Sequence, residues 1–340
     1  MPPAVVYSLN VMWALLRDYR IQFRYWPRFV LMVLINLINW PFRTYERLFI
    51  NPGYRQLKEG TEIIFIVGHW RSGTTHLHNL ISQDSQMGYT TTYQSVFPDT
   101  LFNRLGYFLF EGFARLLIPG KRAGDNVQLG MQLPQEEEFA LGAKTPLCFY
   151  YFWMFPKDIR RIYERSIRFK NVSPSLINQW NKDYELLISK ALKNTETSVY
   201  LSKNPSHTGR VKHLLKRFPK AKFIFIHRNP VEVYLSTDNF FKNMMPHLQL
   251  QQITKEERQQ SIIDLYKTIM KDFFDQKTLV PEGQYSEISF DNLEQTPLEC
   301  VEHIYKALNL EGYDAAKPHF QSFIDKMKSY EKNQHVISKS

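Results

Sequence analysis

The chain has 340 residues, of which 44% are hydrophobic, and this apolar content supports a substantial core and excludes a disordered protein. Lysine and arginine number 43 against 33 aspartates and glutamates, and the formal charge of +10 favours phosphate-bearing ligands, acidic lipids or nucleic acid. The two cysteines, Cys148 and Cys300, lie far apart without metal-type spacing. We therefore expect a reducing compartment, no disulfide framework and no zinc site.

Residues 1–55 form an aromatic-rich segment that is predicted to be helical. Its longest apolar run, Phe29 to Phe42, contains Asn36, Asn39 and Pro41, so it is shorter and more polar than the ~20 apolar residues of a spanning helix. Two interpretations stay open: helices that pack on a catalytic domain, or an interfacial helix whose arginines meet acidic headgroups. No export signal is recognisable, so we expect a cytoplasmic protein, with peripheral membrane contact through residues 1–50 as the alternative.

Strand and helix patterns alternate through the rest of the chain. The run Ile63 to Val67 predicts a buried strand that ends at Gly68, and a helix is expected from about Thr74 to Ser82. Residues 56–340 are therefore predicted to form an α/β domain, a three-layer sandwich around a largely parallel sheet that binds ligands beyond the carboxyl ends of its strands. Further strands are expected at 198–201, 222–226 and 285–290, and further helices at 175–194, 208–218, 231–241, 258–276 and 297–309.

The loop between the first strand and its helix, Gly68 to Thr75, has the character of an anion site. Backbone N–H groups and the helix dipole would converge there on a phosphate or sulfate. Its glycines have the spacing of a P-loop, but the lysine position holds Thr74 and the cation comes earlier, as Arg71. The strand at 222–226 runs into His227-Arg228 instead of an acid, so no magnesium site is expected. The alternative is a glycine-rich turn that only joins strand to helix.

This P-loop-like segment resembles the sulfotransferases that use 3′-phosphoadenosine-5′-phosphosulfate (PAPS), particularly their bacterial-type and tyrosylprotein groups. Residues 71–75 (RSGTT) are similar to the family's 5′-phosphosulfate loop. The resemblance implies that Arg71 holds the bridging region of the sulfuryl group. It also implies 5′-phosphate contacts from Ser72, Gly73, Thr74 and Thr75.

Two further segments strengthen the resemblance. Residues 223–236 (FIFIHRNPVEVYLS) are similar to the 3′-phosphate block, which implies that Arg228 and Ser236 bind that phosphate. An arginine that leaves a strand and a serine two helical turns later can both face one phosphate. Residues 201–205 (LSKNP) resemble the Lys-x-Pro element, which implies that Lys203 lies near the transferred group. Arg228 as a surface cation and Lys203 as a solvated residue remain alternatives.

The C-terminal third resembles the family less closely. Residues 285–293 (YSEISFDNL) are similar to the strand and acidic turn that close the family's core, and Tyr285 is included on this basis as a donor contact. Cytosolic members carry a basic Arg-Lys-Gly block that clasps the 3′-phosphate. In its place the chain offers Lys326, Lys328, Lys332 and Asn333, so this clasp is incompletely assigned.

Sulfuryl transfer to a hydroxyl needs a base, which typically contributes ~10²–10⁴-fold to the rate. Residues 134–141 (PQEEEFAL) resemble the element that supplies a catalytic glutamate, which points to Glu136 first and Glu138 second, with Glu137 between them. Repulsion among three carboxylates is expected to raise the pKa of whichever one is desolvated. Proline followed by glutamates is also good first-turn helix chemistry that needs no catalytic role.

Aromatic-rich stretches at 89–120 and 147–155 predict core residues or the wall of an apolar acceptor pocket. With the N-terminal segment, they favour a hydrophobic alcohol such as a sterol, steroid or lipid as acceptor, over a carbohydrate or a peptide tyrosine. A P-loop kinase or nucleotidase and a non-catalytic PAPS-binding scaffold are the alternative functions. No nucleic-acid partner is expected, because the positive charge is scattered along the chain.

Overall fold

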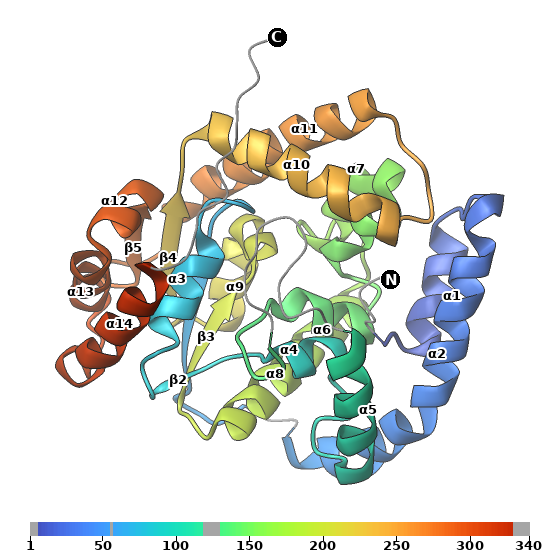
Figure 1. Cartoon of the computed structure of the whole chain (residues 1–340), viewed down its shortest axis with the longest axis horizontal. Helices are drawn as coiled ribbons and strands as arrows, with labels where there is room; N and C mark the ends of the chain where they lie inside the picture. The colour runs from blue at the N-terminus through green and yellow to red at the C-terminus, as the bar shows by residue number, and fades with distance from the viewer. Residues whose placement is uncertain (1–5, 55–56, 118–129, 329–340) are drawn as a thin grey trace.

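A computed structural model describes residues 6–54, 57–117 and 130–328 of the chain (Figure 1). At its centre lies a five-stranded sheet with strand order β2-β3-β1-β4-β5, in which each neighbouring pair is parallel. The predicted parallel α/β sheet is thus confirmed. The strands are β1 (Glu62–Val67), β2 (Met87–Gly88), β3 (Val199–Lys203), β4 (Lys222–His227) and β5 (Tyr285–Ser289).

Helices cover both faces of the sheet, because the side chains of β1 alternate between two cores. Ile64 and Ile66 belong to one core, whereas Phe65 and Val67 belong to the other. The first core is closed by α3 (Thr74–Ile81), α12 (Phe290–Gln295), α13 (Pro297–Ala307) and α14 (Tyr313–Lys328). The second is closed by α6 (Glu137–Lys144), α8 (Pro174–Thr195), α9 (Val211–Arg217) and α11 (Lys255–Lys277). This arrangement is the three-layer sandwich that the sequence predicts.

A third hydrophobic cluster joins the N-terminal helices α1 (Leu9–Asp18) and α2 (Trp26–Tyr45) to the body of the molecule. The two helices lie side by side along one flank of the protein (Figure 1). Ser8 caps α1 by accepting the N–H of Val11 at 3.1 Å. The cluster also includes residues of the aromatic 3₁₀ segment η4 (Phe149–Trp153), α7 (Ile159–Ser166) and α10 (Pro230–Leu248).

Shorter elements connect these layers. After α2 the chain continues through a π turn and a 3₁₀ turn before β1, and two helices follow β2. Within the described ranges, no helix is long and apolar enough to cross a membrane. The remaining elements are Phe23–Tyr25, Glu46–Ile50, Asn51–Tyr54, α4 (Thr92–Val96), α5 (Arg104–Leu117), Pro156–Asp158 and Pro205–Gly209.

Several boundaries differ from the prediction. The helix expected at 208–218 begins at Val211, because Pro205–Gly209 forms a 3₁₀ turn. The helix expected at 231–241 runs on to Leu248, through Pro246 in its last turn. Proline at that position removes one helical hydrogen bond without ending the helix.

Candidate active site

The loop after β1 has a backbone that two glycines make possible. Gly68 has φ +151° and Gly73 has φ +96°. A Cβ on Gly68 would lie 2.3 Å from the carbonyl oxygen of Ile226, and one on Gly73 would lie 2.2 Å from the ring of Phe290. Between them Arg71 adopts φ +70°, a conformation that costs a non-glycine residue roughly 1–3 kcal/mol. Strain of this kind is typical of loops that bind ligands.

The side chain of Ser72 is turned into this loop. Its Oγ lies 2.7 Å from the carbonyl oxygen of His69, and its backbone N–H donates to the same oxygen at 3.2 Å. Ser72 therefore stabilises the shape of the loop through both its hydroxyl and its backbone N–H. Thr74 and Thr75 open α3, where first-turn N–H groups have no acceptor within the helix and could bind an anion.

Lys203 and Glu136 meet beside this loop. Lys203 ends β3, the neighbour of β1, and its buried ammonium forms an ion pair with Oε1 of Glu136. The Lys203 ammonium also donates to Oγ1 of Thr75 at 3.3 Å. Tyr150 donates its hydroxyl hydrogen to Oε2 of Glu136 and accepts the indole N–H of Trp70 at 3.0 Å. A continuous polar chain thus links the anion loop to the aromatic segment η4.

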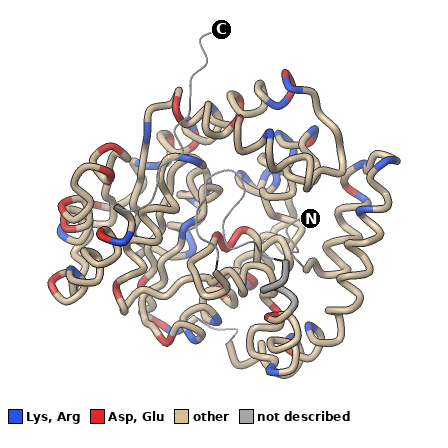
Figure 2. Tube along the Cα trace, viewed as in Figure 1, with Lys and Arg blue, Asp and Glu red and all other residues tan. Residues whose placement is uncertain are grey.

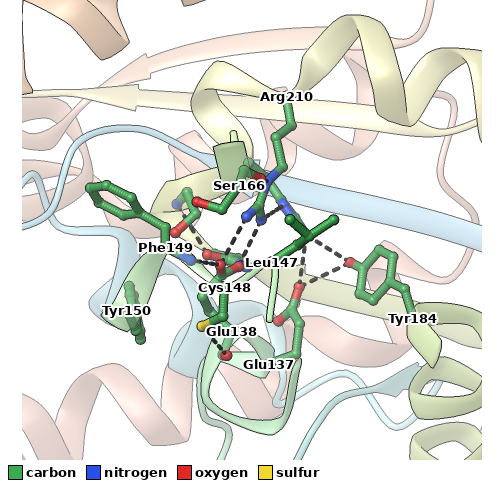
Figure 3. Close-up of polar contacts among 12 residues, drawn as sticks. Glu137, Glu138, Leu147, Cys148, Phe149, Tyr150, Ser166, Tyr184 and Arg210 are labelled. Atoms are coloured by element: carbon green, nitrogen blue, oxygen red, sulfur yellow. Dashed lines mark hydrogen bonds and ion pairs between the residues drawn. The ribbon is translucent and has the colours of Figure 1, made fainter. Parts of the chain in front are cut away.

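Glu138 is buried and points toward Arg210 (Figure 3). Its carboxylate accepts two hydrogen bonds from Arg210, at 2.7 and 2.8 Å, and one each from the Phe149 N–H and the Asn204 amide, both at 2.7 Å. Burial alone would raise the pKa of Glu138, but Arg210 and Asn204 outweigh burial and lower this pKa to about 2. The structure pairs the carboxylate of Glu138, the second candidate base in the sequence, with Arg210 in the interior.

Glu137 is also committed to the interior. It accepts the Tyr184 hydroxyl at 3.0 Å and the hydroxyl of Ser202. Burial favours a raised pKa, yet hydrogen bonds from His207 and Ser202 lower the pKa of Glu137. The expected repulsion among the three carboxylates does not govern Glu137 or Glu138, because each has its own donors. Of the three, Glu136 is the most exposed, with 11% of its side chain accessible to solvent.

Two arginines flank the loop on the side of α10. Arg71 donates its Nε–H to Oγ of Ser236 at 2.9 Å, and its guanidinium lies 5.3 Å from the centre of the Phe240 ring. Arg228 follows β4, pairs with Glu232 at 2.5 Å, and lies 4.4 Å from the centre of the Phe290 ring. The structure therefore brings Ser236 against Arg71, and it places Arg228 on the ring that packs beside Gly73.

Tyr285 does not join this site. It begins β5 and pairs in register with Phe223, near the start of β4, so it lies at the amino end of the sheet, opposite the loop. Its hydroxyl donates to Glu287 at 2.6 Å. The structure thus places Tyr285, which the sequence analysis includes as a donor contact, at the opposite end of the sheet from the loop. Among the C-terminal candidates, Lys326 is exposed, whereas Lys332, Asn333 and the side chain of Lys328 lie outside the described residues.

Comparison with known proteins gives this site its context. A model described as "Sulfotransferase family" matches residues 63–315. The chain belongs to the sulfotransferase family. It is 27% identical, over 319 residues, to the omega-hydroxy-beta-dihydromenaquinone-9 sulfotransferases Stf3 of Mycobacterium bovis and Mycobacterium tuberculosis, covering 92% of this chain and 79% of each relative.

Solved sulfotransferases share the fold. The crystal structure of STF1 from Mycobacterium tuberculosis superposes with a TM-score of 0.66 and 16% identity, covering 93% of this chain and 85% of that one. STF9 from Mycobacterium avium gives a TM-score of 0.65 and 17% identity, covering 98% and 91%. Membership in the sulfotransferase family argues against the alternative of a P-loop kinase or nucleotidase. Among the described residues, no cluster of histidine, cysteine, aspartate and glutamate could hold a metal ion.

This sulfotransferase also has an apolar cavity next to Glu136. The cavity is narrow and opens to solvent. Tyr150, whose hydroxyl binds the Glu136 carboxylate, forms part of the wall, so one side chain connects the cavity to the candidate base. The walls are Tyr7, Met32, Phe139, Tyr150, Trp153, Met154 and Leu248.

Sequence reasoning missed several residues that organise the site. Tyr150 lies in an aromatic run that predicts only a core or a pocket wall. Arg210, the partner of Glu138, has no motif around it. Thr208 accepts the Gly68 N–H at 2.8 Å and so fixes the start of the loop. The rule that buried carboxylates need donors could have predicted a partner for Glu138, but not which residue supplies it.

Proposed function

We propose that this sulfotransferase moves a sulfuryl group from PAPS to the hydroxyl of a hydrophobic alcohol, with Glu136 as the general base. One observation carries the proposal. Glu136 is linked on one side to the anion loop, through Lys203 and Thr75, and on the other to the apolar cavity, through Tyr150. A carboxylate in this position can receive a proton from an acceptor in the cavity while it faces a donor held by the loop.

On the donor side, the proposal assigns the 5′-phosphate to the first turn of α3, where backbone N–H groups and the hydroxyls of Thr74 and Thr75 are available for an anion. Arg228 and Ser236 take the 3′-phosphate, as the resemblance to the family implies. Arg71 and Lys203 are charged and already fixed in place by Ser236 and Glu136. Such preorganised cations stabilise charge that develops during a reaction.

In the reaction, the acceptor oxygen forms a bond to sulfur while the bond from sulfur to the 5′-phosphate oxygen breaks. The hydroxyl proton passes to Glu136, and the electron pair of the broken bond leaves with adenosine 3′,5′-bisphosphate. Lys203 is paired with Glu136 in this structure. As the carboxylate takes the proton, the ammonium is released from that pair to stabilise the negative charge on the departing oxygen.

The lining of the cavity supports a hydrophobic acceptor. Its walls are aromatic rings, methionines and a leucine, and such surfaces bind apolar molecules. The Stf3 relatives, named for a dihydromenaquinone, support the same class of acceptor. The N-terminal segment to residue 55 then contributes part of the acceptor wall through Tyr7 and Met32, and residues 56–340 contribute the rest of the wall and the donor side.

The test is transfer from sulfur-labelled PAPS, without added metal, to a panel of lipophilic alcohols, phenols, glycans and peptides. We expect label in a lipophilic alcohol, loss of transfer in Glu136→Gln with donor binding retained, and weakened donor binding in Arg71→Ala. PAPS binding without transfer to any acceptor would favour the scaffold function. Absence of PAPS binding would overturn the proposal.

A further inference from the structure

The second half of helix α2 has its polarity reversed relative to an ordinary surface helix. Such a helix buries its apolar stripe and exposes its polar one. In the second half of α2, the buried positions are Asn36, Asn39 and Arg43. The outward positions are apolar and about half exposed or more: Val30 49%, Leu31 50%, Leu34 52%, Leu37 47%, Ile38 65% and Trp40 53%. We call these six residues the outer face of α2.

Buried polar contacts hold α2 in this orientation. Arg43 donates to the carbonyl oxygens of Val6 at 3.2 Å and Ala143 at 2.9 Å, and it pairs with Asp99 at 2.8 Å. One turn later, Glu46 pairs with the buried Lys190. Rotating α2 to bury its leucines would leave these charges without partners, at a large cost. The fold therefore fixes the outer face of α2 outward.

Helix α5 extends the apolar surface beside the C-terminal half of α2. The rings of Phe42 and Phe110 meet edge to face at 5.4 Å, so the two helices are in contact. On α5, Leu105 is 62% exposed and Phe108 is 74% exposed. Contiguous exposed apolar surface of this kind marks an interaction site.

Charged residues are absent from the outer face of α2, and arginines lie beyond both of its ends. No lysine, arginine, aspartate or glutamate occurs between Arg28 and Arg43, and Figure 2 shows α2 uncharged between its two ends. Exposed arginines lie beyond each end: Arg20 and Arg24 before α2, and Arg47 and Arg104 after it. An apolar centre with arginines around it is the pattern of helices that lie in the interface of an acidic lipid layer.

We propose that the outer face of α2 docks on an acidic lipid surface, with its aliphatic side chains and Trp40 in the headgroup boundary and the flanking arginines on the headgroups. A second copy of the chain fits less well. Whether two α2 helices paired parallel or antiparallel, an arginine-bearing end would meet another arginine-bearing end.

Docking would also place the acceptor cavity beside the lipid. Met32, on the inward side of α2, lines that cavity, so a single helix separates the cavity from the outer face. A hydrophobic alcohol dissolved in the lipid layer would then have a short route to Glu136. This consequence rests on the proposed function, whereas docking itself does not.

The test is cosedimentation of the full chain with vesicles of phosphatidylcholine, with and without phosphatidylglycerol, in the absence of donor and acceptor. We expect binding that phosphatidylglycerol strengthens. The variant Leu34→Glu with Ile38→Glu should bind at least about tenfold more weakly, because charged side chains oppose insertion of the face. The matched control is Leu279→Glu, which charges a leucine of nearly equal exposure, 51%, away from α2 and should bind as wild type does.

A second variant, Arg20→Gln with Arg47→Gln, should lose affinity for phosphatidylglycerol vesicles by roughly fivefold per arginine.

The proposal would be overturned if the wild type does not bind the vesicles, or if the Leu34→Glu, Ile38→Glu variant binds them as the wild type does. So would a wild-type dimer that this variant converts to a monomer, because the face would then belong to a second copy. Equal melting temperatures of the variants and wild type would show that a loss of binding is not a loss of fold. Because no donor is present, these outcomes are independent of the proposed reaction.

Discussion

The proposed donor side and the proposed acceptor side of this site are built in different ways. The proposal assigns most of the donor side to two short continuous stretches, residues 68–75 and 228–236, each at the carboxyl end of a parallel strand. The acceptor cavity is assembled from residues as far apart as Tyr7 and Leu248. A phosphate site depends on local backbone geometry, so its sequence is recognisable, whereas an apolar wall needs only residues of suitable size that the fold brings together.

This contrast predicts that donor-side changes affect every acceptor alike, whereas acceptor-side changes depend on the alcohol. Glu136 belongs to neither side alone, since its partners include Lys203 at the loop and Tyr150 at the cavity.

The largest expected effect is therefore on Glu136. Glu136→Gln removes the proton acceptor at nearly constant shape, and kcat should fall by ~10²–10⁴-fold for every acceptor, with donor affinity changed far less. Single-turnover transfer and PAPS titration measure the two quantities separately. Near wild-type turnover would show that proton transfer takes another route.

Glu138 should behave as a structural group, which acid unfolding can show. Its pKa is about 2 in the folded protein, below the ~4.3 of an unfolded glutamate. Its pairing with Arg210 therefore contributes stability that is complete above about pH 4.3 and is lost as the pH falls toward 2. Glu138→Gln should lower the free energy of unfolding at pH 7 by roughly 3–5 kcal/mol, since it leaves a buried charge unpaired.

Urea denaturation as a function of pH measures this contribution. The wild type should lose stability between about pH 4.3 and pH 2 by more than Glu138→Gln does. Glu136→Gln is the matched control, because it should retain the pH dependence that Glu138 contributes. Equal pH dependence in the wild type and Glu138→Gln would contradict the buried pair.

A donor-side test uses Arg228, which leaves β4 beside Phe290. Arg228→Gln should weaken PAPS binding by roughly 10–100-fold, the range expected when a charged hydrogen bond is lost. The KM values of different acceptors should be unaffected relative to one another. Lys216→Gln, at an exposed position of α9, is the control. Calorimetric titration of PAPS decides between donor contact and the alternative of a surface cation, for which affinity would not change.

The smallest expected effect lies on the acceptor side. Met32→Trp would fill part of the cavity from α2 and should raise the KM of bulky alcohols several-fold, more than that of small ones, with the donor KM unchanged. Leu34→Trp, which enlarges a residue on the outward side of the same helix, is the matched control and should leave both KM values unchanged. An equal response of small and bulky alcohols to Met32→Trp would place acceptor binding elsewhere.

Features with a local sequence pattern could be predicted, whereas features that depend on contacts between distant residues could not. The parallel sheet and the strand-loop-helix unit at 62–81 could be predicted, because alternating cores and glycine positions leave a local pattern. The two-residue strand β2 is too short to show a periodicity, and it depends on its pairing with β3, which is distant in sequence. The roles of Glu136, Glu137 and Glu138 could not be distinguished from the sequence either. They depend on partners such as Arg210, which is 72 residues from Glu138.

One competition experiment tests the central claim most directly. Purified protein receives labelled PAPS together with a lipophilic alcohol and a polysaccharide at equal hydroxyl concentration, and the label in the organic and aqueous products is counted. The account predicts label in the lipophilic alcohol, and its loss in Glu136→Gln. Label in the polysaccharide in preference to every lipophilic alcohol offered would contradict the hydrophobic acceptor that the cavity beside Glu136 supports.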